Sequence, residues 1–76
     1  MKRNNGNLLS SAMRVLVFFA ANPDLVFTTH EMERKFSLEN VRQILRPYVA
    51  NGLVAKTTYP NRKVEYSAGP ALLELI

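Results

Sequence analysis

Several polar residues in one stretch of this chain have side chains that can form hydrogen bonds with the edges of DNA bases. Asn40, Arg42, Gln43 and Arg46 lie within residues 40–46, and Glu39 precedes them. Arginine pairs bidentately with guanine, asparagine and glutamine pair with adenine, and glutamate accepts from cytosine. This stretch therefore has the chemistry for reading a base sequence, provided that one element presents these side chains together.

The apolar residues of the same stretch indicate that the element is a helix. Val41, Ile44, Leu45 and Tyr48 follow a three-and-four spacing, which places them on one side and the polar residues on the other. We predict a third helix over about 38–51, with Ser37 as its N-cap and Gly52 at its end. The alternative for the polar side is an ordinary solvated helix surface.

Pro47 lies inside this predicted helix. A proline removes one backbone hydrogen bond and clashes with the preceding turn, so we expect a kink or a loosening there. Packing of Tyr48 and Val49 must then hold the last turn. The kink can let residues 39–46 lie in a groove while the final turn bends back, or it can be tolerated without a role.

Other polar residues can bind the DNA backbone. Arg62 and Lys63 lie in "YPNRK", which has the composition of a turn between two strands, and from there they can contact phosphates. Thr29 and Ser37 lie where the second and third helices are predicted to begin, and backbone N–H groups at such positions favour phosphate, so both are predicted DNA-binding residues. The alternatives are a solvated charged turn for Arg62 and Lys63 and a capping role for the residues around Thr29.

The remaining sequence predicts the elements that must position these residues. Helix periodicity runs over 8–21, "DLVFT" is compatible with a short strand, and Thr28 with Glu31 has the spacing of a capping box that opens a second helix. "LVAKTTY" and "KVEYS" predict a hairpin, and "ALLELI" predicts a short last helix. The fold class is therefore α+β, with a flexible basic segment over 1–7 and one domain over 8–76. We expect the first helix to be buried on most sides.

The composition limits the classes of function. The chain has 76 residues, a net charge of +4 and no cysteine. The length indicates one small domain, the charge favours a polyanion as partner, and the lack of cysteine permits a reducing compartment, with the cytoplasm as the default. The longest apolar run, 15–21, is too short for a membrane span. His30 is the single histidine, so we expect no metal site, no cofactor and no small-molecule ligand, and no set of residues indicates an enzyme.

The order of elements and the third helix resemble the winged helix-turn-helix domain of bacterial repressors of the multidrug-resistance and arsenic-resistance types. In those repressors a valine near the start of the third helix is followed by apolar residues three, four and seven positions on, and by Gly-Leu eleven positions on. The matching residues here are Val41, Ile44, Leu45, Tyr48, Gly52 and Leu53, with Tyr48 where leucine is usual. "VEYSAGPALLELI" is similar to the way in which those domains leave the hairpin through a tyrosine and a glycine into an apolar helix.

The resemblance implies a three-helix core, a β-hairpin wing and binding to double-stranded DNA, with the third helix in the major groove and the wing on the backbone. We expect a small transcriptional regulator of bacterial, archaeal or phage origin. The alternative is a winged helix that regulates a partner protein without reading DNA. Leu72, Leu73, Leu75 and Ile76 are the predicted surface of a homodimer, unless they cover the chain's own core.

Overall fold

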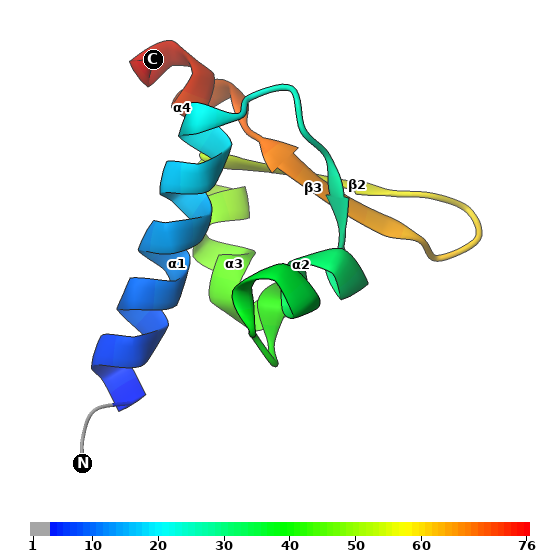
Figure 1. Cartoon of the computed structure of the whole chain (residues 1–76). Coiled ribbons are helices and arrows are strands. Elements are labelled where there is room, and N and C mark those ends of the chain that lie inside the picture. The colour runs from blue at the N-terminus through cyan, green and yellow to red at the C-terminus, as the bar shows by residue number, and fades with distance from the viewer. Residues whose placement is uncertain (1–3) are drawn as a thin grey trace.

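The computed structural model describes residues 4–76, with side chains from Ser11 onward, and these residues form a small α+β fold (Figure 1). Four helices and a three-stranded antiparallel sheet make up this part of the chain. In chain order they are α1 (Asn4–Ala21), β1 (Phe27–Thr28), α2 (Thr29–Phe36), α3 (Val41–Ala50), β2 (Val54–Thr58), β3 (Val64–Ala68) and α4 (Pro70–Leu75). The predicted class and order of elements are confirmed.

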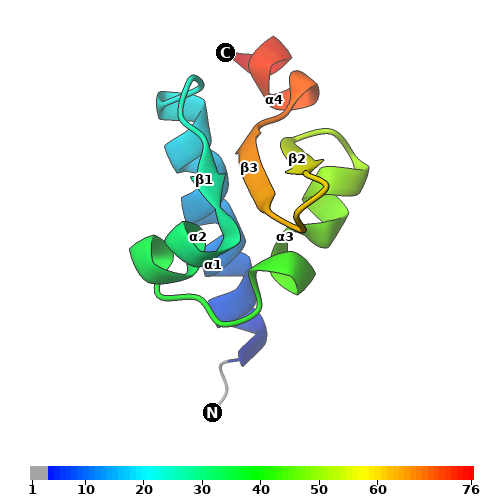
Figure 2. The same ribbon diagram turned by 90° about the vertical axis from the view of Figure 1, so that its right-hand side faces the viewer.

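The sheet has the strand order β1-β3-β2, so β3 lies in its centre. In the predicted hairpin Val54 pairs with Ala68 and Thr58 with Val64, while Phe27 of β1 pairs with Tyr66 on the other edge of β3. The turn of the hairpin projects away from the helices (Figure 1). Figure 2 shows β1 next to α1 and α2, and β2 next to α3.

Helix α1 begins at Asn4, which is earlier than the predicted start at Leu8, and it ends at Ala21 as predicted. Asn22 closes it, because both its backbone N–H and its side-chain amide donate to the Phe18 carbonyl oxygen, at 2.9 and 3.0 Å. The expected burial on most sides is wrong: Met13 is 57% exposed and Val17 is 62% exposed. Of the predicted flexible segment, residues 4–7 lie in α1 and residues 1–3 lie outside the described part of the chain.

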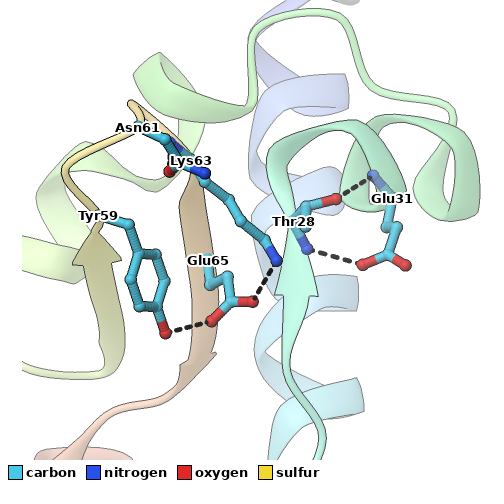
Figure 3. A network of polar contacts seen from close by, with 6 residues as sticks. All are labelled: Thr28, Glu31, Tyr59, Asn61, Lys63 and Glu65. Atoms are coloured by element: carbon cyan, nitrogen blue, oxygen red, sulfur yellow. Dashed lines mark hydrogen bonds and ion pairs between the residues drawn. The ribbon is translucent and has the colours of Figure 1, made fainter.

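Helix α2 begins with the predicted capping box (Figure 3). The Glu31 backbone N–H donates to Thr28 Oγ1 at 3.2 Å, and the Thr28 N–H donates to Glu31 Oε1 at 2.8 Å. Two N–H groups that the first turn of a helix leaves without partners are thereby satisfied. The inward side of α2 carries Met32 and Phe36, both buried as predicted.

The predicted start of the third helix is wrong by three residues. Ser37 is not its N-cap but the left-handed C-cap of α2, with φ of 55°, and α3 begins at Val41 after Asn40. The reason is the burial of Leu38, whose N–H donates to the Glu33 carbonyl oxygen at 3.0 Å while its side chain joins the core. This arrangement has the hydrogen bonds and the apolar contact of a Schellman-type helix end.

Helix α3 continues through Pro47 to Ala50 without a break. Val41 and Leu45 are buried, and Ile44, Tyr48 and Val49 pack against the core that Val15 and Phe19 of α1 share with α2, β2 and β3. The last turn closes with an N–H···O bond of 3.0 Å from Asn51 to Pro47. Packing therefore holds the turn after the proline, as the sequence requires.

Helix α4 returns to the turn between α3 and β2. The Gly69 N–H donates to the Leu53 carbonyl oxygen and the Ala71 N–H to the Gly52 carbonyl oxygen, both at 2.9 Å. Leu72 is buried in the core, so this residue covers the chain's own core, which is the alternative to the predicted dimer surface. The other residues of the predicted dimer surface, Leu73, Leu75 and Ile76, are 45, 75 and 61% exposed.

None of the helices described, from Asn4 to Leu75, combines the length and the apolar character that crossing a membrane requires.

Candidate functional site

The outer side of α3 carries the polar residues singled out in the sequence. The exposed residues of α3 include Arg42, Gln43 and Arg46, which lie away from the side that carries the buried Val41 and Leu45. Asn40 is the N-cap of α3, but its side chain makes no capping hydrogen bond, so its amide is available to a partner. Glu39 is exposed directly before it.

These side chains line one large, open hollow. Its volume is about 730 Å³, and its walls come from α2, α3, β2 and β3. The lining residues are Thr29, Glu33, Glu39, Asn40, Val41, Arg42, Gln43, Arg46, Val49, Ala50, Lys56 and Tyr66. The structure thus brings Thr29 together with all five predicted base-reading residues.

A second hollow, of about 540 Å³, lies between the start of α2 and the hairpin. Thr28 lines it from β1, Thr29 and His30 from α2, and Arg42 from α3. The lining residues of the hairpin are Thr58, Arg62, Lys63 and Val64. Because Thr29 and Arg42 line both hollows, the two adjoin. Only Ser37, in the turn between α2 and α3, lines neither hollow among the predicted DNA-binding residues.

Three basic side chains of residues 11–76 have a partner within the chain, and one of them, Lys63, lines the second hollow. Arg14 donates to the Phe36 carbonyl oxygen at 3.3 Å, Lys35 lies 4.6 Å from the Phe18 ring centroid, and Lys63 Nζ lies 3.4 Å from Glu65 Oε2.

Within residues 11–76, the basic side chains with no ion pair, side-chain hydrogen bond or aromatic contact are Arg34, Arg42, Arg46, Lys56 and Arg62. All of them except Arg34 line the two hollows. Arg42 and Arg46 are four positions apart on one helix, a like-charge spacing that costs about 0.2–0.5 kcal/mol. An anionic partner would relieve that repulsion, while Glu33 and Glu39 contribute negative charge to the hollow of about 730 Å³.

Sequence reasoning missed Lys56. It lies two positions after Val54 in β2, so both side chains are on the same face of the strand. Val54 is buried and Lys56 is exposed where the strand passes the edge of the core, beside α3. The period of two in "LVAKTT" could have placed this lysine on the face of Val54, but it does not specify that this face lies beside the third helix.

The hairpin carries a polar network (Figure 3). Tyr59 Oη donates to Glu65 Oε1 at 2.7 Å, and the Lys63 ammonium pairs with the other carboxylate oxygen of Glu65. At the turn, Asn61 Oδ1 accepts from the Lys63 N–H at 3.1 Å. Of the two basic residues predicted at the tip, Lys63 is thus engaged within the hairpin. Arg62 has no ion pair or side-chain hydrogen bond within residues 11–76, and it holds a left-handed φ of 71°.

This network predicts a pH dependence of stability. The hydrogen bond from Tyr59, helped by Lys63 and opposed by partial burial, lowers the pKa of Glu65 below its ordinary value of 4.5. A lowered pKa in the folded state means that the contribution is present above pH 4.5 and is lost as the pH falls through the folded pKa. We expect the free energy of unfolding of Tyr59→Phe to fall less steeply below about pH 4.5 than that of the natural sequence, as urea titrations at several pH values would measure.

The same hydrogen bond predicts a second change in the free energy of unfolding at alkaline pH. The bond to Glu65 raises the pKa of Tyr59 above 10.0, so its contribution is present below pH 10 and is lost as the pH rises through the folded pKa. If the free energy of unfolding changes with pH in the same way for Tyr59→Phe and for the natural sequence, in both the acidic and the alkaline range, the network is not formed in solution.

Tyr66, in the centre of β3, lines the larger hollow but is only 1% exposed. Its hydroxyl is buried beside the Thr29 side chain and makes no hydrogen bond of acceptable geometry with the residues that the structure describes. Burial raises the pKa of Tyr66, while the neighbouring Thr29 hydroxyl and the charge of Arg42 oppose that shift. A buried hydroxyl without a partner costs about 1–3 kcal/mol, so this oxygen is an energetic anomaly beside the site.

No group of three or more His, Cys, Asp or Glu side chains gathers within the part of the chain that the structure describes. Comparison of the sequence with models of protein families and with curated proteins, and of the structure with solved structures, gives no match.

Proposed function

We propose that the protein is a winged helix-turn-helix domain that binds double-stranded DNA in a sequence-specific manner, as a small transcriptional regulator. In this proposal α3 lies in the major groove and the β2-β3 hairpin is the wing on the DNA backbone. The observation that carries the proposal is the gathering of four basic side chains that have no partner within residues 11–76, Arg42, Arg46, Lys56 and Arg62, around two adjoining hollows.

The roles follow from the chemistry of each side chain. Arg42, Gln43 and Arg46 lie on the exposed side of α3 and have the donors for base edges, with Asn40 at the start of that helix. Lys56 and Arg62 lie on the hairpin, where positive charge binds phosphates without reading sequence. Thr29 is the first residue of α2, and backbone N–H groups at the N-terminus of a helix favour a phosphate.

Salt dependence of binding tests this proposal. With about three to four phosphates neutralised, affinity for a duplex falls by roughly 40- to 150-fold between 50 and 200 mM salt. Fluorescence anisotropy with a labelled duplex measures the slope. A slope near zero would contradict DNA binding and would favour the alternative, a partner protein held by an apolar interface.

One observation favours that alternative. Met13, Val17, Phe18 and Phe36 contribute to an apolar hollow of about 480 Å³ beside the exposed side of α1. Exposed apolar surface of this kind is typical of protein contacts. The same surface is also compatible with DNA binding as a dimer, in which exposed Leu75 of α4 and the following Ile76 would pair two copies on a two-fold symmetric site.

Arg62 allows stability and binding to be separated. A left-handed φ of 71° disfavours arginine and suits glycine, so Arg62→Gly is expected to keep or raise the free energy of unfolding by up to about 1 kcal/mol. The same change removes a phosphate contact, so duplex affinity should fall about three- to tenfold and the salt slope by about 1. Thermal melts and anisotropy measure the two effects.

Asn61→Ala, at the neighbouring position of the turn, leaves all charges in place and is the control for a general disturbance of the hairpin. Unchanged affinity of Arg62→Gly would mean that the tip does not contact DNA.

A further inference from the structure

The unpartnered hydroxyl of Tyr66 lies at the point where three elements of the proposed DNA-binding surface meet. Tyr66 is in β3, Thr29 begins α2 and Arg42 is in α3, and all three line the larger hollow. Phenylalanine would fill the same core position without leaving a polar atom buried and unsatisfied. A tyrosine here is therefore explained best if its hydroxyl gains a partner in another state of the protein.

Arg42 is the charged donor suited to become that partner. Arg42 lines both hollows: the larger one, which Tyr66 also lines, and the second one, which the residues of the hairpin line. Its side chain therefore lies where the two hollows meet. It is exposed and makes no ion pair or side-chain hydrogen bond within residues 11–76. A guanidinium has five N–H donors in a planar fork, so it can donate one to Tyr66 and keep a pair for a guanine.

We propose that Tyr66 is a positioning residue for base recognition: on DNA its hydroxyl accepts a hydrogen bond from the Arg42 guanidinium and fixes the plane in which Arg42 faces the base edge. This inference depends on the proposed function. Holding a flexible arginine in one conformation reduces the entropy that binding costs. The buried hydroxyl thus has no partner in the free protein and acquires one in the complex.

A double-mutant cycle with Tyr66→Phe and Arg42→Ala tests this directly. Tyr66→Phe should leave the melting temperature unchanged or higher, because it removes an unsatisfied buried group. It should lower affinity for the selected duplex by about fivefold and relax the base preference at the position that Arg42 reads. In the Arg42→Ala background the same change should have no effect on affinity.

The control is Tyr48→Phe, which removes a hydroxyl from a half-buried tyrosine of α3 that lines neither hollow, and which should change neither affinity nor base preference. Additive effects of Tyr66→Phe and Arg42→Ala would overturn the inference, as would coupling to Thr29→Val instead. A lower melting temperature of Tyr66→Phe would also overturn it, because the hydroxyl would then have a partner in the free protein. If the natural sequence binds no duplex, the proposed function fails. If it binds a duplex but the two substitutions are additive, only the role of Tyr66 fails.

Discussion

Replacement of Gly69 by alanine is expected to lower the melting temperature by about 20 °C or more, or to prevent folding altogether. A Cβ at this position would lie 2.1 Å from the Gly52 carbonyl oxygen and 2.8 Å from the Leu53 carbonyl carbon. Both are backbone atoms, so relief requires the chain between β3 and α4 to move away from the turn after α3. That movement breaks the hydrogen bonds from Gly69 to Leu53 and from Ala71 to Gly52.

The loss should be about 4 kcal/mol or more, which is unusual for a single methyl group. A chain of this length has a total stability of only about 4–11 kcal/mol, so the change uses much of it. Thermal unfolding followed by circular dichroism measures the effect. Pro70→Ala, at the exposed neighbouring position, is the control and should shift the melting temperature by a few degrees at most. A shift below about 5 °C for Gly69→Ala would contradict the close docking of α4.

Replacement of Arg42 and Arg46 together by alanine is expected to lower duplex affinity about 100-fold or more. Each arginine that pairs with a guanine contributes about 1–3 kcal/mol, and each also carries a charge that attracts the backbone. Stability should be unchanged or higher, because the variant removes a like-charge pair from one turn of α3 and introduces two alanines into the helix.

The matched control is Arg34→Ala with Lys35→Ala. It removes the same two charges from the last turn of α2, and neither residue lines a hollow of the proposed surface. Its affinity should fall only slightly, through the lower net charge, and loss of the contact between Lys35 and Phe18 should be visible as a small decrease in melting temperature. Equal losses of affinity in the two double variants would mean that binding follows net charge and that α3 has no special place in it.

The elements were predictable where local chemistry and tertiary packing favour the same structure. Thr28 and Glu31 form the capping box that their spacing predicts, because both bonds close within the first turn of α2. Asn22 ends α1 as predicted, since the following proline cannot continue a helix. The inward side of α3 was predictable for the same reason, because Val41 and Leu45 have the period of a helix.

The failures occur where packing between distant residues decides. Ser37 has the preferences of an N-cap, yet the burial of Leu38 makes it the left-handed end of α2. The exposed side of α1 was missed because its apolar residues continue past the buried stripe, and only the positions of α2 and α3 decide which of them are covered. Lys56 and Tyr66 became part of the site because β2 and β3 pass beside α3, which no local pattern in the sequence specifies.

Whether α3 reads a base sequence is decided by selection of duplexes from a randomised pool at about 150 mM salt, followed by sequencing of the bound molecules. We expect the natural sequence and the Arg34→Ala/Lys35→Ala variant to enrich one common motif, with two-fold symmetry if two copies bind together. The Arg42→Ala/Arg46→Ala variant should enrich none. Absence of a motif for the natural sequence, or the same motif for the Arg42→Ala/Arg46→Ala variant, would contradict the account in which α3 reads DNA.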